Sequence, residues 1–102
     1  MNNSSPTRVV LYTLLSGDWL PGAEFHCSPE DGVTLVVHDP KRGGSIAQKY
    51  YDRGIGNDAE RRLVTRDEPE MFMRTLLQPS QSTFYRWVDE STAGTVAEDS
   101  GA

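Results

Sequence analysis

The residue types best suited to chemistry are His26, Cys27 and His38, with Asp39 directly after the second histidine. A thiol beside an imidazole can form a nucleophile and its base. Imidazole, thiolate and carboxylate groups together can ligate a zinc ion. Either chemistry requires the side chains to converge, so the question is how the surrounding elements orient them.

The segments 23–27 and 33–38 predict a β-hairpin, because both are rich in residues that favour strands. A two-residue turn at 31–32 would mix polar and apolar side chains on both faces of that hairpin. A loop over 28–32 separates them, and Pro29 fits a loop better than a paired strand. We expect the longer loop, since an apolar face on one side only is what fixes strand register.

In this register Cys27 pairs with Val33, and Phe25 pairs with Leu35. One face then carries the apolar side chains of Phe25, Cys27, Val33, Leu35 and Val37, and the other carries Glu24, His26, Thr34, Val36 and His38.

Strand geometry argues against a reactive centre. His26 and Cys27 are neighbours on one strand, so their side chains point to opposite faces. His26 is expected opposite Thr34, and His38 lies four residues further on, about 13 Å away at ~3.3 Å per residue. The sequence therefore predicts no catalytic residue, no metal and no cofactor, and an enzyme with a Cys27 or His38 centre is a minor alternative.

Three further strands are expected around this hairpin. Residues 8–15 (RVVLYTLL) are apolar on both alternating faces, which is typical of an interior strand. Residues 61–65 form a short candidate strand, and 83–88 (TFYRWV) has the composition of a strand, although its apolar spacing also suits a helix. The segments 16–22 and 54–58 are predicted as turns because of their Gly, Pro, Asn and Asp content.

The first of two predicted helices covers 46–53. Ser45 is a suitable N-cap, and Gln48 three residues later completes a capping box. Gly54 can adopt the backbone conformation that ends helices.

The second helix follows Asp67, which forms the same type of capping box with Glu70, and Pro79 ends it. A helical stripe of apolar residues predicts the face that meets the core: Pro69, Phe72, Met73, Leu76 and Leu77.

These elements predict an α+β fold: a small antiparallel or mixed β-sheet of about four to five strands with two helices packed on one face. Residues 7–88 are expected to form this single domain. The polar segments 1–6 and 89–102 predict disordered ends, and the second of these is an acidic tail.

Charge is distributed unevenly along the chain, whose net charge is −5. Residues 7–40 carry one cation and five anions, whereas residues 41–66 carry seven cations and three anions. The basic segment places cations beside a helix N-terminus, where anions are favoured. A capped turn whose charges are neutralised within the chain is the simpler interpretation of the same residues.

Lys49 and Arg53 are one helical turn apart, and like charges at that spacing are unfavourable unless an anion neutralises them. Two aromatic residues, Tyr51 and Trp19, are suited to contact with another protein. The predicted binding residues are thus Lys41, Arg42, Lys49, Arg53, Tyr51, Trp19, Arg61 and Arg62.

The sequence favours a small non-enzymatic binding or regulatory module that acts through protein–protein contact, with a partner protein or by self-association through a sheet edge. The alternative is a nucleic-acid or phosphate binder that uses the basic 41–66 segment. A single cysteine excludes an internal disulfide. With no run of ~18 apolar residues and no visible secretion signal, we expect a cytoplasmic protein without membrane contact.

Overall fold

The computed structural model describes residues 6–57, 62–78 and 82–91. The elements, in chain order, are β1 (Arg8–Leu15), β2 (Asp18–Ser28), β3 (Gly32–Val37), the 3-10 helix η1 (Pro40–Arg42), α1 (Gly44–Arg53), β4 (Ile55–Asn57), β5 (Arg62–Val64), α2 (Pro69–Leu77) and β6 (Tyr85–Asp89). They form a four-stranded antiparallel sheet, a two-stranded sheet and two α-helices. The predicted α+β fold is confirmed.

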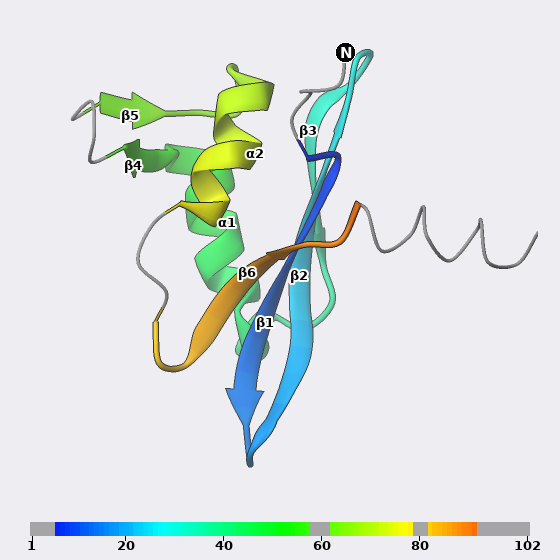
Figure 1. The fold of residues 1–102 in the computed structure, drawn as a ribbon, viewed down its shortest axis with the longest axis vertical. Helices are drawn as coiled ribbons and strands as arrows, with labels where there is room; N and C mark the ends of the chain where they lie inside the picture. The colour runs from blue at the N-terminus through cyan, green and yellow to red at the C-terminus, as the bar shows by residue number, and fades with distance from the viewer. Residues whose placement is uncertain (1–5, 58–61, 79–81, 92–102) are drawn as a thin grey trace, which may run out of the picture.

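The four-stranded sheet has the order β3-β2-β1-β6, and every neighbouring pair is antiparallel. Strand β1 is therefore an interior strand, as its two apolar faces predicted. Both helices lie on one side of this sheet, and no described helix covers the other side (Figure 1). The tip of the β1–β2 hairpin extends beyond the helices (Figure 1).

The predicted register of the β2–β3 hairpin is confirmed. Cys27 pairs with Val33, Phe25 with Leu35, and His26 with Thr34 across the two strands. Val33 is buried, and Cys27 and Leu35 pack against the hydrophobic core. Burial of the apolar face therefore selected this register. The predicted loop over 28–32 is too long, because Ser28 and Gly32 pair with each other and only residues 29–31 connect the strands.

The predicted connection over 16–22 is wrong, because β2 already begins at Asp18. Only Ser16 and Gly17 form the turn, with φ angles of 53° and 87°. Positive φ at both central residues is the geometry that matches the twist of a two-residue hairpin. The strand pairing shifts by one residue near Pro21, where a β-bulge accommodates the missing N–H.

Both predicted capping boxes are wrong. The N-cap of α1 is Gly43, without a side-chain cap, and Gln48 donates its hydrogen bond to Asp52. Gly43 has a φ of 100°, and a Cβ on it would lie 2.7 Å from Leu11. Close packing of this turn on β1 thus sets the start of α1, one residue before Ser45.

Helix α2 begins at Pro69 after Glu68, which makes no side-chain cap either, so Asp67 does not serve as the N-cap. The predicted apolar stripe is nevertheless confirmed, since Phe72, Met73 and Leu76 are fully buried. Pro79, which was expected to end the helix, lies outside the described residues.

The predicted turn over 54–58 is partly wrong, because Ile55–Asn57 form β4 and pair with β5. Ile55 and Val64 are opposite each other and both are buried, so this small hairpin closes one end of the core. A strand is confirmed within the predicted segment 83–88, but β6 begins at Tyr85 and runs to Asp89.

The core lies between the sheet and the helices, and aromatic rings form its centre. The ring of Phe25 lies 5.1 Å from that of Phe72 in an edge-to-face arrangement. It also lies 5.7 Å from the ring of Trp87 and 6.3 Å from that of Tyr51. Strands β2 and β6 and both helices are therefore joined through one side chain.

Candidate functional site on the uncovered face of the sheet

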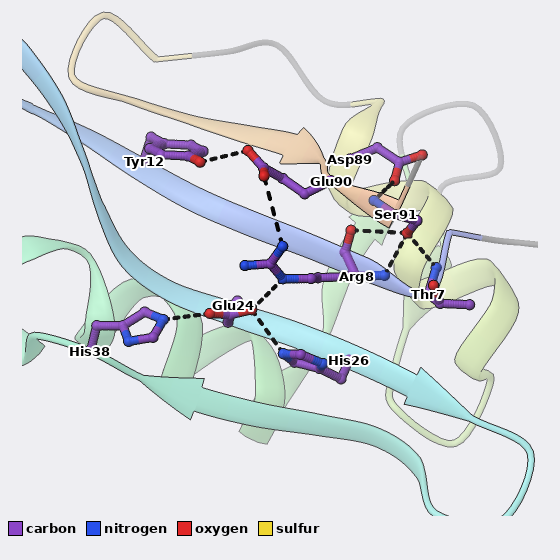
Figure 2. Close-up of polar contacts among 9 residues, drawn as sticks. All are labelled: Thr7, Arg8, Tyr12, Glu24, His26, His38, Asp89, Glu90 and Ser91. Atoms are coloured by element: carbon purple, nitrogen blue, oxygen red, sulfur yellow. Dashed lines mark hydrogen bonds and ion pairs between the residues drawn. The ribbon is translucent and has the colours of Figure 1, made fainter. Parts of the chain in front are cut away.

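The thiol and the imidazoles lie on opposite faces of the sheet, as the alternation of strand residues predicted. Cys27 packs against the core on the helix side, and burial followed by the nearby charge of Glu70 raises the pKa of its thiol. His26 points to the uncovered face (Figure 2). No reactive pair of Cys27 with either histidine is formed.

The predicted separation of His26 from His38 is wrong, because both imidazoles bind the same carboxylate. The Nε2 atom of His26 lies 2.8 Å from Oε1 of Glu24, and Nε2 of His38 bonds the other oxygen, Oε2 (Figure 2). His38 follows the last residue of β3, where its backbone N–H binds the carbonyl of Gly22. This bond holds the chain against β2, and the long side chain of Glu24 bridges the remaining distance.

Glu24 is the centre of this face and is only 7% exposed. Burial alone would raise the pKa of its carboxyl group. Hydrogen bonds from Arg8, His38 and His26 outweigh burial and lower the pKa to about 2. The carboxylate is therefore ionised at neutral pH, so it accepts from the Nε2–H group of each imidazole and from Nε of Arg8 at 2.7 Å.

The same network reaches the residues after β6. The hydroxyl of Tyr12 donates to Oε2 of Glu90 at 2.5 Å, and Arg8 lies 3.8 Å from the other oxygen of that carboxylate. Ser91 accepts hydrogen bonds from the backbone N–H groups of Thr7 and Arg8. The folded region therefore extends past the predicted boundary at residue 88, while residues 92–102 of the predicted acidic tail lie outside the described part.

We name this set the Glu24 cluster and define it as Arg8, Tyr12, Glu24, His26, His38 and Glu90. Its residues come from β1 and β2 and from the positions directly after β3 and β6. The cluster therefore connects all four strands of the sheet. Among the described residues, no group of three or more His, Cys, Asp and Glu side chains could hold a metal ion. The hydrogen bonds and ion pairs of the cluster connect the strands on this face.

Sequence reasoning did not identify Glu24 as the centre of the cluster. The available signal was its position: Glu24 is an acidic residue on the polar face of a strand, and the pattern of 8–15 predicted an interior neighbour. A carboxylate in the middle of a sheet needs cationic or hydrogen-bonding partners. Arg8, His26 and His38 could have been named as those partners.

A second feature lies at the tip of the β1–β2 hairpin. Leu14 and Trp19 are direct cross-strand partners, and the carbonyl of Phe84 accepts a hydrogen bond from Leu14 N–H. Phe84 is 70% exposed and Leu15 at the end of β1 is 49% exposed. Leu15 points to the opposite face of β1 from Leu14. We name the other three apolar residues, Leu14, Trp19 and Phe84, the distal patch.

Arg86 borders the distal patch, and its guanidinium lies 3.9 Å from the centre of the Trp19 ring. Trp19 is thus held by a cation–π contact in β2, and not in a loop as the sequence predicted.

The predicted basic residues are spread over several elements. Lys41 and Arg42 lie in η1, Lys49 and Arg53 are exposed on α1, and Arg62 lies in β5. Arg61 lies outside the described residues. Trp19, on the hairpin, does not lie in the same elements as these cations.

Several of these groups have partners within the chain. Arg42 lies 3.3 Å from Asp39, and Arg62 lies 2.6 Å from Glu68. The Tyr51 ring stacks on Phe25. The guanidinium of Arg66 lies 4.5 Å from the centre of the Tyr51 ring. Part of the basic charge is therefore neutralised internally, while the use of these residues in binding stays a prediction.

Comparison of the chain with protein-family models, with curated proteins and with solved structures found no match. None of the described helices is both long and apolar enough to span a membrane.

Proposed function

We propose that this chain is a small non-enzymatic binding or regulatory module that acts through protein–protein contact, and that the distal patch is its contact surface. The observation that carries the proposal is the exposed side chain of Phe84, which lies beside Leu14 on a hairpin that extends beyond the helices (Figure 1). Leu14 and its cross-strand partner Trp19 are half-buried. Phe84 is 70% exposed. Exposed apolar groups gathered in one place mark interaction sites in soluble proteins.

The composition of the distal patch supports the proposal. Tryptophan and arginine are enriched among the residues that dominate binding energy at protein interfaces, and phenylalanine is enriched at their centres. The contact with Arg86 fixes the Trp19 ring before a partner arrives. A partner then loses less free energy to ordering this side chain.

The two alternatives have less support. A phosphate or nucleic-acid surface needs several cations directed at one ligand, whereas Arg42 and Arg62 already form ion pairs on different elements. An enzyme centred on Cys27 would need a base on the helix side of the sheet, but both histidines bind Glu24 on the other side.

The proposal is tested by affinity capture from the native lysate with the full-length chain and three variants. We expect a specific protein to be retained by the unmodified chain and by Leu63→Ala, whose side chain is 56% exposed on β5. Trp19→Ala and Phe84→Ala should lose that protein while their circular dichroism spectra stay unchanged. Equal retention by all four chains, or no retained protein at all, contradicts the proposal.

A further inference from the structure

Strand β3 forms one edge of the four-stranded sheet. Its sequence, GVTLVV, contains no charged residue and no proline. Natural sheet edges are normally protected by charges, prolines or bulges, because an unprotected edge can pair with another strand. Val36 is 38% exposed and Val37 is 39% exposed, so apolar side chains of this edge also face solvent.

The backbone hydrogen bonds determine which residues of β3 remain available for pairing. Cys27 N–H binds the carbonyl of Thr7 on the β1 side, so odd-numbered residues near this end of β2 direct their backbone groups toward β1. The even-numbered residues face β3, as the bond from His38 N–H to Gly22 shows.

On β3, the residues opposite the even-numbered ones are Gly32, Thr34 and Val36. Their backbone groups pair with β2. The intervening residues Val33, Leu35 and Val37 therefore direct N–H and C=O groups away from the sheet.

We propose that this edge pairs with the same edge of a second copy of the chain. The two β3 strands run antiparallel about a two-fold axis at Leu35, which joins the two sheets into one sheet of eight strands. Leu35 then pairs with Leu35 of the second copy, and Val33 pairs with Val37 of the second copy. Each of these pairs exchanges two backbone hydrogen bonds.

The proposal commits to a second copy because the strand is complementary to itself in this register. Thr34 lies opposite Val36 of the second copy, so every pair between Val33 and Val37 joins apolar or β-branched side chains. Such pairs stabilise neighbouring strands, and no like charges are placed opposite each other among them. The ladder ends at His38, because Asp39 N–H turns back to the carbonyl of Gly22.

This self-association goes beyond the proposed function and uses a different surface. The distal patch lies at the hairpin tip of β1 and β2, whereas the paired edge is β3. A dimer would present two distal patches to a partner, and binding to a partner with two matching sites would be strengthened by their linkage.

The decisive experiment is hydrogen exchange of the full-length chain, followed amide by amide by NMR at several protein concentrations. We expect the amides of Val33, Leu35 and Val37 to become protected as concentration rises from about 10 μM to about 1 mM, the range in which weak interfaces form. The amides of Thr34 and Val36, which already bind β2, should not change. Sedimentation equilibrium on the same samples should show a monomer–dimer equilibrium.

A charge variant with a matched control tests the register. Val37→Lys places an ammonium group opposite Val33 of the second copy, and we expect the dimer dissociation constant to rise roughly ten-fold or more. Leu63→Lys introduces the same charge at an exposed apolar position of β5 and should leave the constant unchanged. Trp19→Ala should also leave it unchanged, while it abolishes partner capture through the distal patch.

A strictly monomeric chain at the highest concentration overturns the self-association without affecting the proposed distal contact. A dimer that Trp19→Ala dissociates, or one whose odd-numbered β3 amides stay unprotected, also overturns it. If the unmodified chain dimerises but captures no partner, the proposed distal contact is contradicted and the self-association stands.

Discussion

The two faces of the four-stranded sheet are stabilised by different forces, although they share the same strands. On the helix side, Phe25 is fully buried among aromatic rings. On the other side, its neighbour Glu24 is almost as deeply buried, but among cationic and hydrogen-bonding groups. The comparison shows that burial alone does not tell how a residue stabilises a fold.

The difference between the faces has a consequence for their response to conditions. Dispersion and the hydrophobic effect, which act on the helix side, change little with pH. The Glu24 cluster depends on a charge, and that charge can be removed by acid. The contributions of the two faces to the free energy of unfolding can therefore be measured separately, by choosing which side chain is altered and at which pH.

The largest effect is expected on the helix-covered face. Phe25→Ala removes a ring that contacts Phe72 and Trp87, and we expect the free energy of unfolding to fall by about 3–5 kcal/mol. Phe84→Ala removes the same side chain from a position that is 70% exposed and should cost less than about 0.5 kcal/mol. Urea unfolding followed by circular dichroism measures both, and equal losses would show that burial of the Phe25 ring does not stabilise the fold.

A smaller loss is expected where η1 meets the sheet. A Cβ atom on Gly22 would lie 1.5 Å from the carbonyl oxygen of Arg42, so Gly22→Ala forces the backbone of η1 away from β2. We expect a loss of about 1–3 kcal/mol, as for other overpacked sites. Gly56→Ala is the control, because a Cβ there meets no atom of the described residues within 4 Å. Urea midpoints that fall equally in the two variants would show that the contact with Arg42 is not tight.

The parts of the fold that could be predicted from the sequence depend on local patterns. The β2–β3 register followed from one apolar face, and the core stripe of α2 followed from the spacing of Phe72, Met73 and Leu76. In both cases residues near in sequence share one environment, so periodicity is sufficient.

The remaining features depend on contacts between distant segments. Ser45 is a good N-cap by type, but the packing of Gly43 on Leu11 decides where α1 begins. His38 approaches Glu24 because the chain after β3 bonds to Gly22, which strand spacing along the hairpin does not reveal. Local preference is overridden there by tertiary contacts.

The Glu24 carboxylate on the uncovered face should contribute less to the stability of the fold in acid. The pKa of Glu24 is about 2 in the folded chain against an ordinary value of 4.5, so its charge stabilises the fold fully above about pH 4.5. This contribution is lost as the pH falls toward 2. We expect Glu24→Gln to lower the free energy of unfolding by about 2 kcal/mol at neutral pH, since Arg8 remains partly solvated and loses its partner.

The difference between the unmodified chain and Glu24→Gln should therefore narrow between about pH 5 and about pH 2. Urea unfolding at a series of pH values measures this narrowing. Glu30→Gln is the matched control, because it removes the same charge from an exposed position in the β2–β3 loop. A difference that stays constant with pH would show that Glu24 does not act through its charge.

The smallest effect concerns the contact between β1 and the residue after β6. The hydrogen bond to Glu90 and partial burial raise the pKa of the Tyr12 hydroxyl above its ordinary value of 10.0. Glu90→Gln replaces the carboxylate with a neutral amide, so the pKa of Tyr12 should fall back toward that value, with a stability loss of only about 0.5–1.5 kcal/mol. Spectrophotometric titration of the tyrosines measures the change, and Tyr12→Phe identifies its contribution among the four tyrosines.

The pKa of Tyr50, which burial raises on the helix side, should not move. A Tyr12 pKa that is indifferent to Glu90→Gln would place residue 90 outside the folded domain, and the Glu24 cluster would then join three strands and not four.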